Sequence, residues 1–198
     1  MKRYKVNEIF YSVQGEGRHA GEAAIFIRLS GCNLKCSFCD TQHNEGTMMT
    51  AEQIAKEVSK YDCALVVITG GEPTLQLDKA LTDALHDAGK YLAMETNGTR
   101  EIDGEIDWVT ISPKRPFCGN VARLALRSCD ELKVVYTNRE TFESAPWLKF
   151  PSKLYYIQPC DTGNAEENAR IIAEVVEYVK QNPEWKISLQ TQKIINVR

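Results

Sequence analysis

Three cysteines within eight residues form the first group in the sequence that could do chemistry. Cys32, Cys36 and Cys39 have the spacing C-x3-C-x2-C, and no fourth cysteine stands close by. They could hold a 4Fe–4S cluster and leave one iron without a protein ligand. They could instead bind zinc, with His43 as a fourth ligand, or bind no metal at all. With a cluster, the open iron could be chelated by a small molecule, so the missing cysteine would itself be functional.

Polar motifs follow the segments expected to form strands. Short apolar, β-branched runs predict strands over 24–29, 64–69, 91–95, 108–111, 132–136, 154–158 and 187–189. "SGCNLKC" follows the first of these strands, "TGGEP" the second, "ETNG" the third, "SPK" the fourth, "QPCD" the sixth and "QTQK" the last. In a parallel barrel the carboxyl ends of the strands lie on one face. We therefore expect these motifs to surround one active site.

Helical patterns alternate with several of the strands. Helices are expected over 51–60, 77–88 and 164–181, with Thr50 capping the first and Gly89 ending the second. Repeated β-α units predict a parallel sheet with right-handed crossovers. A full eight-fold barrel typically needs about 250 residues. We expect an α/β fold, a partial (abbreviated) parallel β/α barrel of about six strands, with residues 1–198 as a single domain.

Composition limits the class of partner. The 198 residues are 43% hydrophobic with a net charge of −3, which gives no basic footprint for nucleic acid or an anionic membrane surface. The apolar runs "AAIFI" and "ALVVI" are too short to cross a bilayer, and no signal-peptide core follows the basic N-terminus. Seven cysteines, an odd number with three clustered, indicate metal ligands in a reducing compartment. We expect a cytoplasmic protein.

The cysteine motif and "GGEP" together resemble the radical S-adenosylmethionine superfamily. Cys32, Cys36, Phe38 and Cys39 match its cluster signature, and residues 70–73 match its second motif. A structural zinc site would need no glycine-rich acidic loop on the neighbouring strand. The resemblance implies a 4Fe–4S cluster whose open iron binds S-adenosylmethionine. Reductive cleavage of that cofactor would give a 5′-deoxyadenosyl radical that abstracts hydrogen.

Each residue of the second motif, "GGEP", has an expected role in binding S-adenosylmethionine. Gly70 and Gly71 would let the backbone approach the cofactor, because any Cβ there would obstruct it. Glu72 is suited to pairing with the cofactor's ammonium group, and Pro73 fixes the turn.

Motifs along the whole chain resemble the 7-carboxy-7-deazaguanine synthase family. They run from "VNEIFYSVQGEGRH" through "ITGGEP", "ETNGT", "VTISPK" and "YIQP" to "LQTQKIINVR". The resemblance implies radical ring contraction of 6-carboxy-5,6,7,8-tetrahydropterin to 7-carboxy-7-deazaguanine, with loss of ammonia, in queuosine biosynthesis. It also implies a Mg2+ requirement, flavodoxin or ferredoxin as reductant, and a homodimer.

The resemblance assigns site residues. Arg28 would pair with the substrate carboxylate, and Gln14 and Glu16 would meet the donor edge of the pterin. Thr41 would bind Mg2+ through its hydroxyl. Cys160 has no ligand role, since a fourth thiolate would close the open iron. The substrate contacts implied are Val13, Gln14, Gly15, Glu16, Arg28 and Thr69. The S-adenosylmethionine contacts implied are Phe38, Cys39, Asp40, Gly71, Glu72, Ser112, Pro113, Lys114, Gln158, Pro159, Cys160 and Asp161.

Two alternatives remain open from the sequence. A glycyl-radical-enzyme activase would share the cluster and "GGEP", but it has no reason to carry "QGEG" or a Mg2+ site. A non-catalytic iron–sulfur or zinc-binding module would not cleave S-adenosylmethionine reductively.

Overall fold

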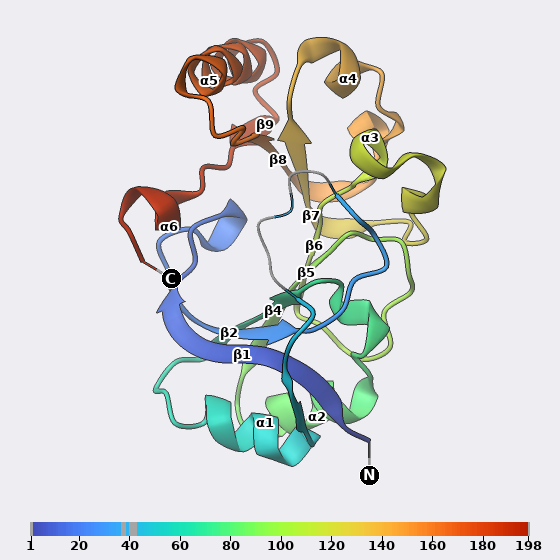
Figure 1. Ribbon diagram of the computed structural model, residues 1–198, viewed down its shortest axis with the longest axis vertical. Coiled ribbons are helices and arrows are strands. Elements are labelled where there is room, and N and C mark those ends of the chain that lie inside the picture. The colour runs from blue at the N-terminus through green and yellow to red at the C-terminus, as the bar shows by residue number, and fades with distance from the viewer. Residues whose placement is uncertain (1, 37–38, 40–42, 198) are drawn as a thin grey trace.

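The strands form one curved, mostly parallel sheet (Figure 1). The computed structural model describes residues 2–36, 39 and 43–197. Its nine-stranded sheet has the order β3-β1-β2-β4-β5-β6-β7-β8-β9. From β2 to β9 neighbouring strands are parallel, whereas β1 is antiparallel to both β2 and β3. The strands are β1 (Tyr4–Val13), β2 (Ala23–Leu29), β3 (Thr47–Met49), β4 (Leu65–Gly70), β5 (Tyr91–Thr96), β6 (Trp108–Ile111), β7 (Cys129–Tyr136), β8 (Ser152–Pro159) and β9 (Trp185–Ile187).

The expected α/β fold is confirmed, with one correction to the strand count. Each of the seven predicted segments lies in or overlaps one of the seven parallel strands, where about six barrel strands were expected. The antiparallel strands β1 and β3 were not predicted. In β1, Lys5 separates the buried Tyr4 and Val6, and Asn7 and Glu8 follow them, so the segment lacks a continuous apolar run.

Side chains at the helix starts explain where the helices begin. Thr50 caps α1 (Ala51–Val58), as expected, and forms a capping box with Gln53. Asp78 caps α2 (Lys79–Asp87), which therefore begins two residues later than expected. Asn164 caps α5 (Ala165–Gln181). The shorter helices are α3 (Arg115–Cys118), α4 (Arg139–Glu143) and α6 (Thr191–Ile194). Among the described residues, no helix is both long enough and apolar enough to span a membrane.

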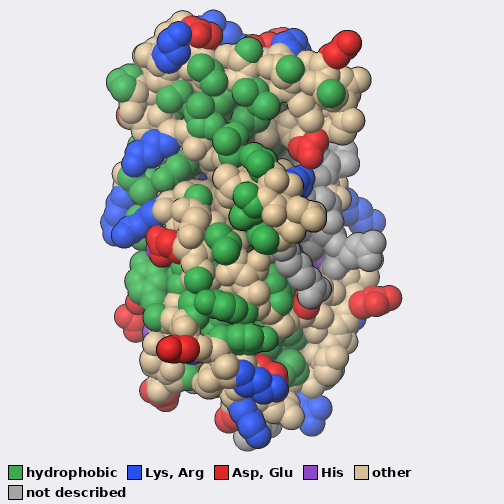
Figure 2. Space-filling view, turned by 90° about the vertical axis from the view of Figure 1, so that its left-hand side faces the viewer, with side chains coloured by type: hydrophobic (Ala, Val, Ile, Leu, Met, Phe, Trp, Pro, Cys, Tyr) green, Lys and Arg blue, Asp and Glu red, His purple; other side chains and the backbone are tan. Residues whose placement is uncertain are grey.

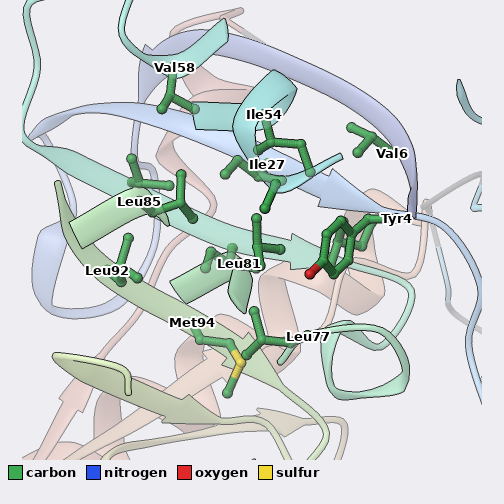
Figure 3. Close-up of a cluster of buried hydrophobic side chains, with 14 of the residues drawn as sticks. Tyr4, Val6, Ile27, Ile54, Val58, Leu77, Leu81, Leu85, Leu92 and Met94 are labelled. Atoms are coloured by element: carbon green, nitrogen blue, oxygen red, sulfur yellow. The ribbon is translucent and has the colours of Figure 1, made fainter. Parts of the chain in front are cut away.

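Alternate side chains along the strands build separate cores on the two faces of the sheet. Ile27 of β2 and Met94 of β5 pack toward α1 and α2, with Leu81 and Leu85 of α2 against them (Figure 3). A second outer cluster packs α5 against β7, β8 and β9. The inner face carries a smaller apolar cluster that includes the stacked rings of Phe10 and Phe26. The inner cluster therefore forms the apolar floor beneath the carboxyl ends of the strands.

Backbone and side-chain hydrogen bonds link the two ends of the curved sheet. The strands β1 and β9 do not pair, but Thr191 N donates to Gly15 O at 3.2 Å. Gly17 N donates to the hydroxyl of Ser188 at 3.0 Å. Segments from opposite ends of the chain thus meet, and α6 lies beside the turn after β1 (Figure 1).

Candidate active site

A cavity of about 900 Å³ lies at the carboxyl ends of the parallel strands. Most residues expected at the active site line it, and they come from the last residues of β1, β2, β4 and β8 and from the segments that follow β1, β2, β4, β6 and β8. These are Val13, Gln14, Gly15, Glu16, Arg28, Cys32, Cys36, Cys39, Thr69, Gly71, Ser112, Lys114, Gln158, Pro159, Cys160 and Asp161. Phe38, Asp40 and Thr41 lie outside the described residues.

The three clustered cysteines share one wall of this cavity. Cys32, Cys36 and Cys39 all line it, and Cys39 N donates to Cys36 O at 3.3 Å. Burial raises the pKa of Cys32, and burial with the neighbouring Cys118 thiol raises that of Cys36 to about 12. Among the described residues, no three Cys, His, Asp or Glu side chains converge closely enough for a metal ion. The donor set nevertheless fits a 4Fe–4S cluster with one open iron, because three thiols from one loop face a common cavity.

The two glycines of "GGEP" bring the loop after β4 against the cysteine loop. Gly70 has a φ of +134°, and a Cβ on it would lie 2.0 Å from Leu29 O. A Cβ on Gly71 would lie 2.0 Å from Gly31 O and 3.0 Å from the Cβ of Cys32. The described chain alone therefore requires both glycines, so they need not be explained by the approach of a cofactor.

Glu72, which was expected to pair with the ammonium group of the cofactor, is held by groups of the protein itself. Its side chain is fully buried and does not line the cavity. One carboxylate oxygen accepts hydrogen bonds from the hydroxyls of Thr74 and Thr96, and the other accepts one from Asn97 N. Glu72 thus ties "GGEP" to "ETNG" inside the protein. Pro113 is likewise buried and is not among the residues that line the cavity.

Arg28 reaches the cavity with one of its nitrogens already paired. Its Nε donates to a carboxylate oxygen of Glu8 at 2.8 Å, and its guanidinium lies 5.9 Å from the centre of the Phe10 ring. Thr69, its register partner on β4, lines the same wall. Glu8 also lines the cavity. Sequence reasoning missed it, because it is one polar residue within an unrecognised strand.

A buried lysine joins two carboxylates in the barrel interior. Lys133 Nζ lies 2.5 Å from an oxygen of Glu16 and 3.2 Å from an oxygen of Glu95. Only 3% of the surface of Lys133 is exposed. The amides of Gln190 and Gln192 donate to the other oxygen of Glu16, at 2.9 and 3.2 Å. Glu16 was expected to face substrate, and here it is also the centre of an internal charge network.

The charges in this network set their pKa values together. Burial alone would raise the pKa of Glu16. The charge of Lys133 and the hydrogen bonds that Glu16 accepts instead hold this pKa well below its usual range. Burial alone would lower the pKa of Lys133, but Glu16 and Glu95 raise it above the usual range. Both groups are therefore charged at neutral pH. Glu95 and Lys133 were not assigned from the sequence, although a lysine inside the apolar strand "ELKVVY" was the available signal.

Most of the remaining expected cofactor residues line other parts of the cavity. Lys114 Nζ donates to the hydroxyl of Ser112 at 2.6 Å, and burial lowers the pKa of Lys114. Asp161 accepts hydrogen bonds from Gly163 N and Asn168, and Lys193 Nζ lies 3.2 Å away. These contacts lower the pKa of Asp161 to about 2. Two cations and a carboxylate thus line the cavity together with the cysteines.

Comparisons with known proteins agree with this arrangement. Residues 26–114 match the model of the radical SAM superfamily. A 7-carboxy-7-deazaguanine synthase of Bacteroides thetaiotaomicron is 50% identical over 194 residues, which cover 98% of each chain. One from Bradyrhizobium diazoefficiens is 38% identical over 221 residues, covering 98% of this chain and 99% of that one.

Solved structures show the same fold. The crystal structure of QueE from Escherichia coli matches with a TM-score of 0.73 and 27% identity, covering 94% of this chain and 93% of that one. Streptococcus suis SuiB bound to the precursor peptide SuiA matches in fold, with a TM-score of 0.52 and 16% identity over 79% of this chain and 46% of that one. The sequence similarity extends over nearly the full length of the curated relatives, and the superfamily match and the QueE fold agree with it. The chain therefore belongs to the 7-carboxy-7-deazaguanine synthase family of radical S-adenosylmethionine enzymes.

Proposed function

We propose that this enzyme converts 6-carboxy-5,6,7,8-tetrahydropterin to 7-carboxy-7-deazaguanine with release of ammonia. The observation that carries the proposal is a single cavity with a cysteine wall and a substrate wall. Cys32, Cys36 and Cys39 line one part of it, and Arg28 and Glu16 line another. Its volume of about 900 Å³ leaves room for a cofactor and a bicyclic substrate together.

The cysteines would hold a 4Fe–4S cluster, and Gly71, Ser112, Lys114 and Asp161 would contact S-adenosylmethionine. When bound, the cluster and S-adenosylmethionine supply the one-electron cleavage that generates a hydrogen-abstracting radical. The protein's residues bind and orient the reactants and exclude water from them.

The substrate residues have the chemistry that the pterin requires. The guanidinium of Arg28 would pair with the substrate carboxylate through nitrogens other than the Nε that Glu8 accepts from. Gln14 and Glu16 would meet the donor edge of the pterin. Lys133 keeps Glu16 ionised, so its carboxylate is an acceptor only. The backbone of residues 13–15 and Thr69 complete this wall.

The hydroxyl of Thr41 is proposed to bind Mg2+. A hydroxyl oxygen and the substrate carboxylate are hard ligands that suit a magnesium ion which keeps several waters. The site would form only when substrate is present.

A homodimer is proposed, with flavodoxin or ferredoxin as the reductant. Hydrophobic side chains are spread over the face in Figure 2, which is the left-hand side of Figure 1, where α5 and α6 lie. Exposed apolar residues of these elements and the segment after α6 are Ile172, Val176, Ile194, Ile195 and Val197. Exposed apolar patches commonly mark protein interfaces. Equilibrium sedimentation tests the dimer.

The proposed location is the cytoplasm, where reduced thiols persist. All seven cysteines are free in the structure. Residues 1–198 are proposed to form one domain, because a single sheet takes its strands from Tyr4 to Ile187.

Anaerobic turnover tests the proposed function. The reconstituted enzyme is incubated with the carboxylated tetrahydropterin, S-adenosylmethionine, a reductant and Mg2+, and the products are analysed by mass spectrometry. We expect 7-carboxy-7-deazaguanine and stoichiometric ammonia, and neither in a Cys36→Ala control. Cleavage of S-adenosylmethionine without conversion of this pterin would reject the substrate while retaining the radical chemistry.

A further inference from the structure

A fourth thiol touches the cysteine wall from another part of the chain. Cys36 Sγ and Cys118 Sγ lie 3.5 Å apart, although the residues are separated by 82 positions in the sequence. Cys118 is the last residue of α3, in the loop region after β6, and both side chains are half-buried. No role for Cys118 follows from the proposed function, which uses only the three clustered cysteines.

The position of Cys118 is fixed by its own helix. Cys118 N donates to Lys114 O at 3.0 Å, and Lys114 lines the cavity beside Cys36. Gly119 follows with a φ of +62° and ends this short helix. The backbone therefore presents the Cys118 thiol to the Cys36 thiol, so small side-chain movements would bring the two sulfurs to bonding distance.

We propose that Cys118 forms a disulfide with Cys36 when the cluster is lost under oxidation. This disulfide would be a reversible modification that protects the Cys36 thiol from irreversible oxidation until the cluster is rebuilt. Without a nearby thiol, an oxidised cysteine proceeds to the sulfinic acid, which is not readily reduced. The inference goes beyond the proposed function, and its central claim concerns the cluster-free chain.

The chemistry balances with a peroxide as the oxidant. The Cys36 sulfur attacks the peroxide, which gives a sulfenic acid and one water. The Cys118 sulfur then attacks the Cys36 sulfur, so that an S–S bond forms and the S–O bond breaks. The departing hydroxide takes the Cys118 proton and leaves as a second water. Two thiols thus give up two electrons, and the peroxide is reduced to water; an added dithiol reverses the change.

Peptide mapping identifies the partner of Cys36. Trypsin places Cys32 in peptide 29–35, Cys36 and Cys39 in 36–56, and Cys118 in 115–123. The full-length chain, freed of iron by a chelator, is treated with hydrogen peroxide, alkylated and digested without reductant. Fragmentation of the linked peptides then distinguishes Cys36 from Cys39.

We expect the 36–56 peptide to be joined to 115–123 through Cys36, at about tenfold the amount of any link to 29–35. The free thiol count should fall by two from seven and return with dithiothreitol. A dominant link between 29–35 and 36–56, or no link at all, would overturn the proposal.

The variant Cys118→Ser tests the protective role. We expect it to accumulate sulfinic acid at Cys36 several-fold above the parent chain, and to regain less iron on reconstitution. Cys63→Ser, which removes a thiol that contacts Ala23 O on another part of the sheet, should behave like the parent. Equal sulfinic acid in the parent and Cys118→Ser would reject the protective role. If this variant folds poorly, the peptide map of the parent chain still tests the disulfide.

The reconstituted protein separates this inference from the proposed function. If Cys36 holds the cluster, the linked peptide should form only after iron is removed. A link that forms equally in reconstituted protein would reject Cys36 as a cluster ligand while the disulfide itself stands.

Discussion

The amine of Lys133 on β7 lies 2.5 Å from a carboxylate oxygen of Glu16, which follows β1 in the sequence. Both groups lie inside the barrel at the cavity wall and are largely buried, so water screens their charges weakly. A buried charge that loses its partner is strongly destabilising, whereas an exposed pair contributes little. The pair therefore couples the shape of the substrate wall to the stability of the whole sheet.

Replacing Lys133 tests the energetic importance of this pair. Lys133→Met leaves Glu16 and Glu95 without their shared cation, so the free energy of unfolding should fall by about 3–5 kcal/mol. Urea denaturation measures it. Lys153→Met is the matched control, because Lys153 pairs with Asp130 at 2.6 Å but its side chain is 72% exposed. That control should change stability by no more than about 1 kcal/mol. Equal losses in the two variants would contradict the role given to burial.

The acid sensitivity of the enzyme should depend on Glu16. Burial would raise its pKa, yet Lys133 and the amides hold the pKa below the ordinary 4.5. A lowered folded-state pKa gives a stabilisation that is fully present above the unfolded-state pKa and is lost as the pH falls toward the folded-state value. The melting temperature of the parent should therefore fall more steeply below pH 4.5 than that of Glu16→Gln. Parallel melting curves from pH 6 to pH 3 would refute this coupling.

Iron content distinguishes a cluster from a zinc site. Cys39→Ala should lose most of its iron and its near-ultraviolet and visible absorbance, because it removes one of three cluster ligands. His43→Ala should keep both, although His43 lines the same cavity and its Nδ1 is buried with no hydrogen-bond partner among the described residues. Metal analysis after anaerobic reconstitution makes the comparison. Loss of metal in His43→Ala, with zinc in the parent, would favour the Cys3His alternative.

Arg28 should act on the substrate and spare the cofactor. Arg28→Ala should lower kcat/KM for the pterin by about 30-fold or more, the effect of losing an ion-paired contact of about 2–5 kcal/mol. Reductive cleavage of S-adenosylmethionine without substrate should persist in the variant. Glu8→Gln offers a milder comparison, since it weakens only the contact to Nε of Arg28. A parallel loss of both reactions in Arg28→Ala would indicate a defect in folding or cofactor binding.

The magnesium requirement should weaken when Thr41 is replaced. Thr41→Val keeps the shape of the side chain and deletes the proposed ligand oxygen. Turnover should fall and its dependence on Mg2+ concentration should flatten, while iron content stays the same. An unchanged Mg2+ titration in this variant would remove Thr41 from the site.

Local sequence patterns predicted the parallel strands and the helix starts well, because caps and apolar runs act within a few residues. The start of α1 at Thr50 depends only on its neighbour Gln53. The cysteine wall could also be anticipated, since three ligands lie in one loop. The curved sheet was harder to complete at its antiparallel edge, where β1 mixes polar and apolar residues on both faces.

The charged interior could not be predicted because it depends on strand order. Glu95 and Lys133 come from strands separated by β6, and only the assembled sheet places Lys133 against both Glu95 and Glu16. Glu72 was assigned to the cofactor because its motif was read alone. The structure instead directs Thr74, Thr96 and Asn97 toward its oxygens. Sequence identified the polar residues, but it could not show which of them partner one another.

The contacts of Glu16 with Gln190 and Gln192 have a consequence for the order of folding. Gln190 and Gln192 lie 174 and 176 positions after Glu16 in the sequence, so each contact closes a loop that includes most of the chain. Contacts between such distant residues form slowly, because the entropy of closing the loop opposes them until the intervening strands are in place. During synthesis Glu16 leaves the ribosome long before its amide partners exist. We therefore expect the substrate wall to be the last region to become protected from hydrogen exchange during refolding, after α1, α2 and the strands they cover.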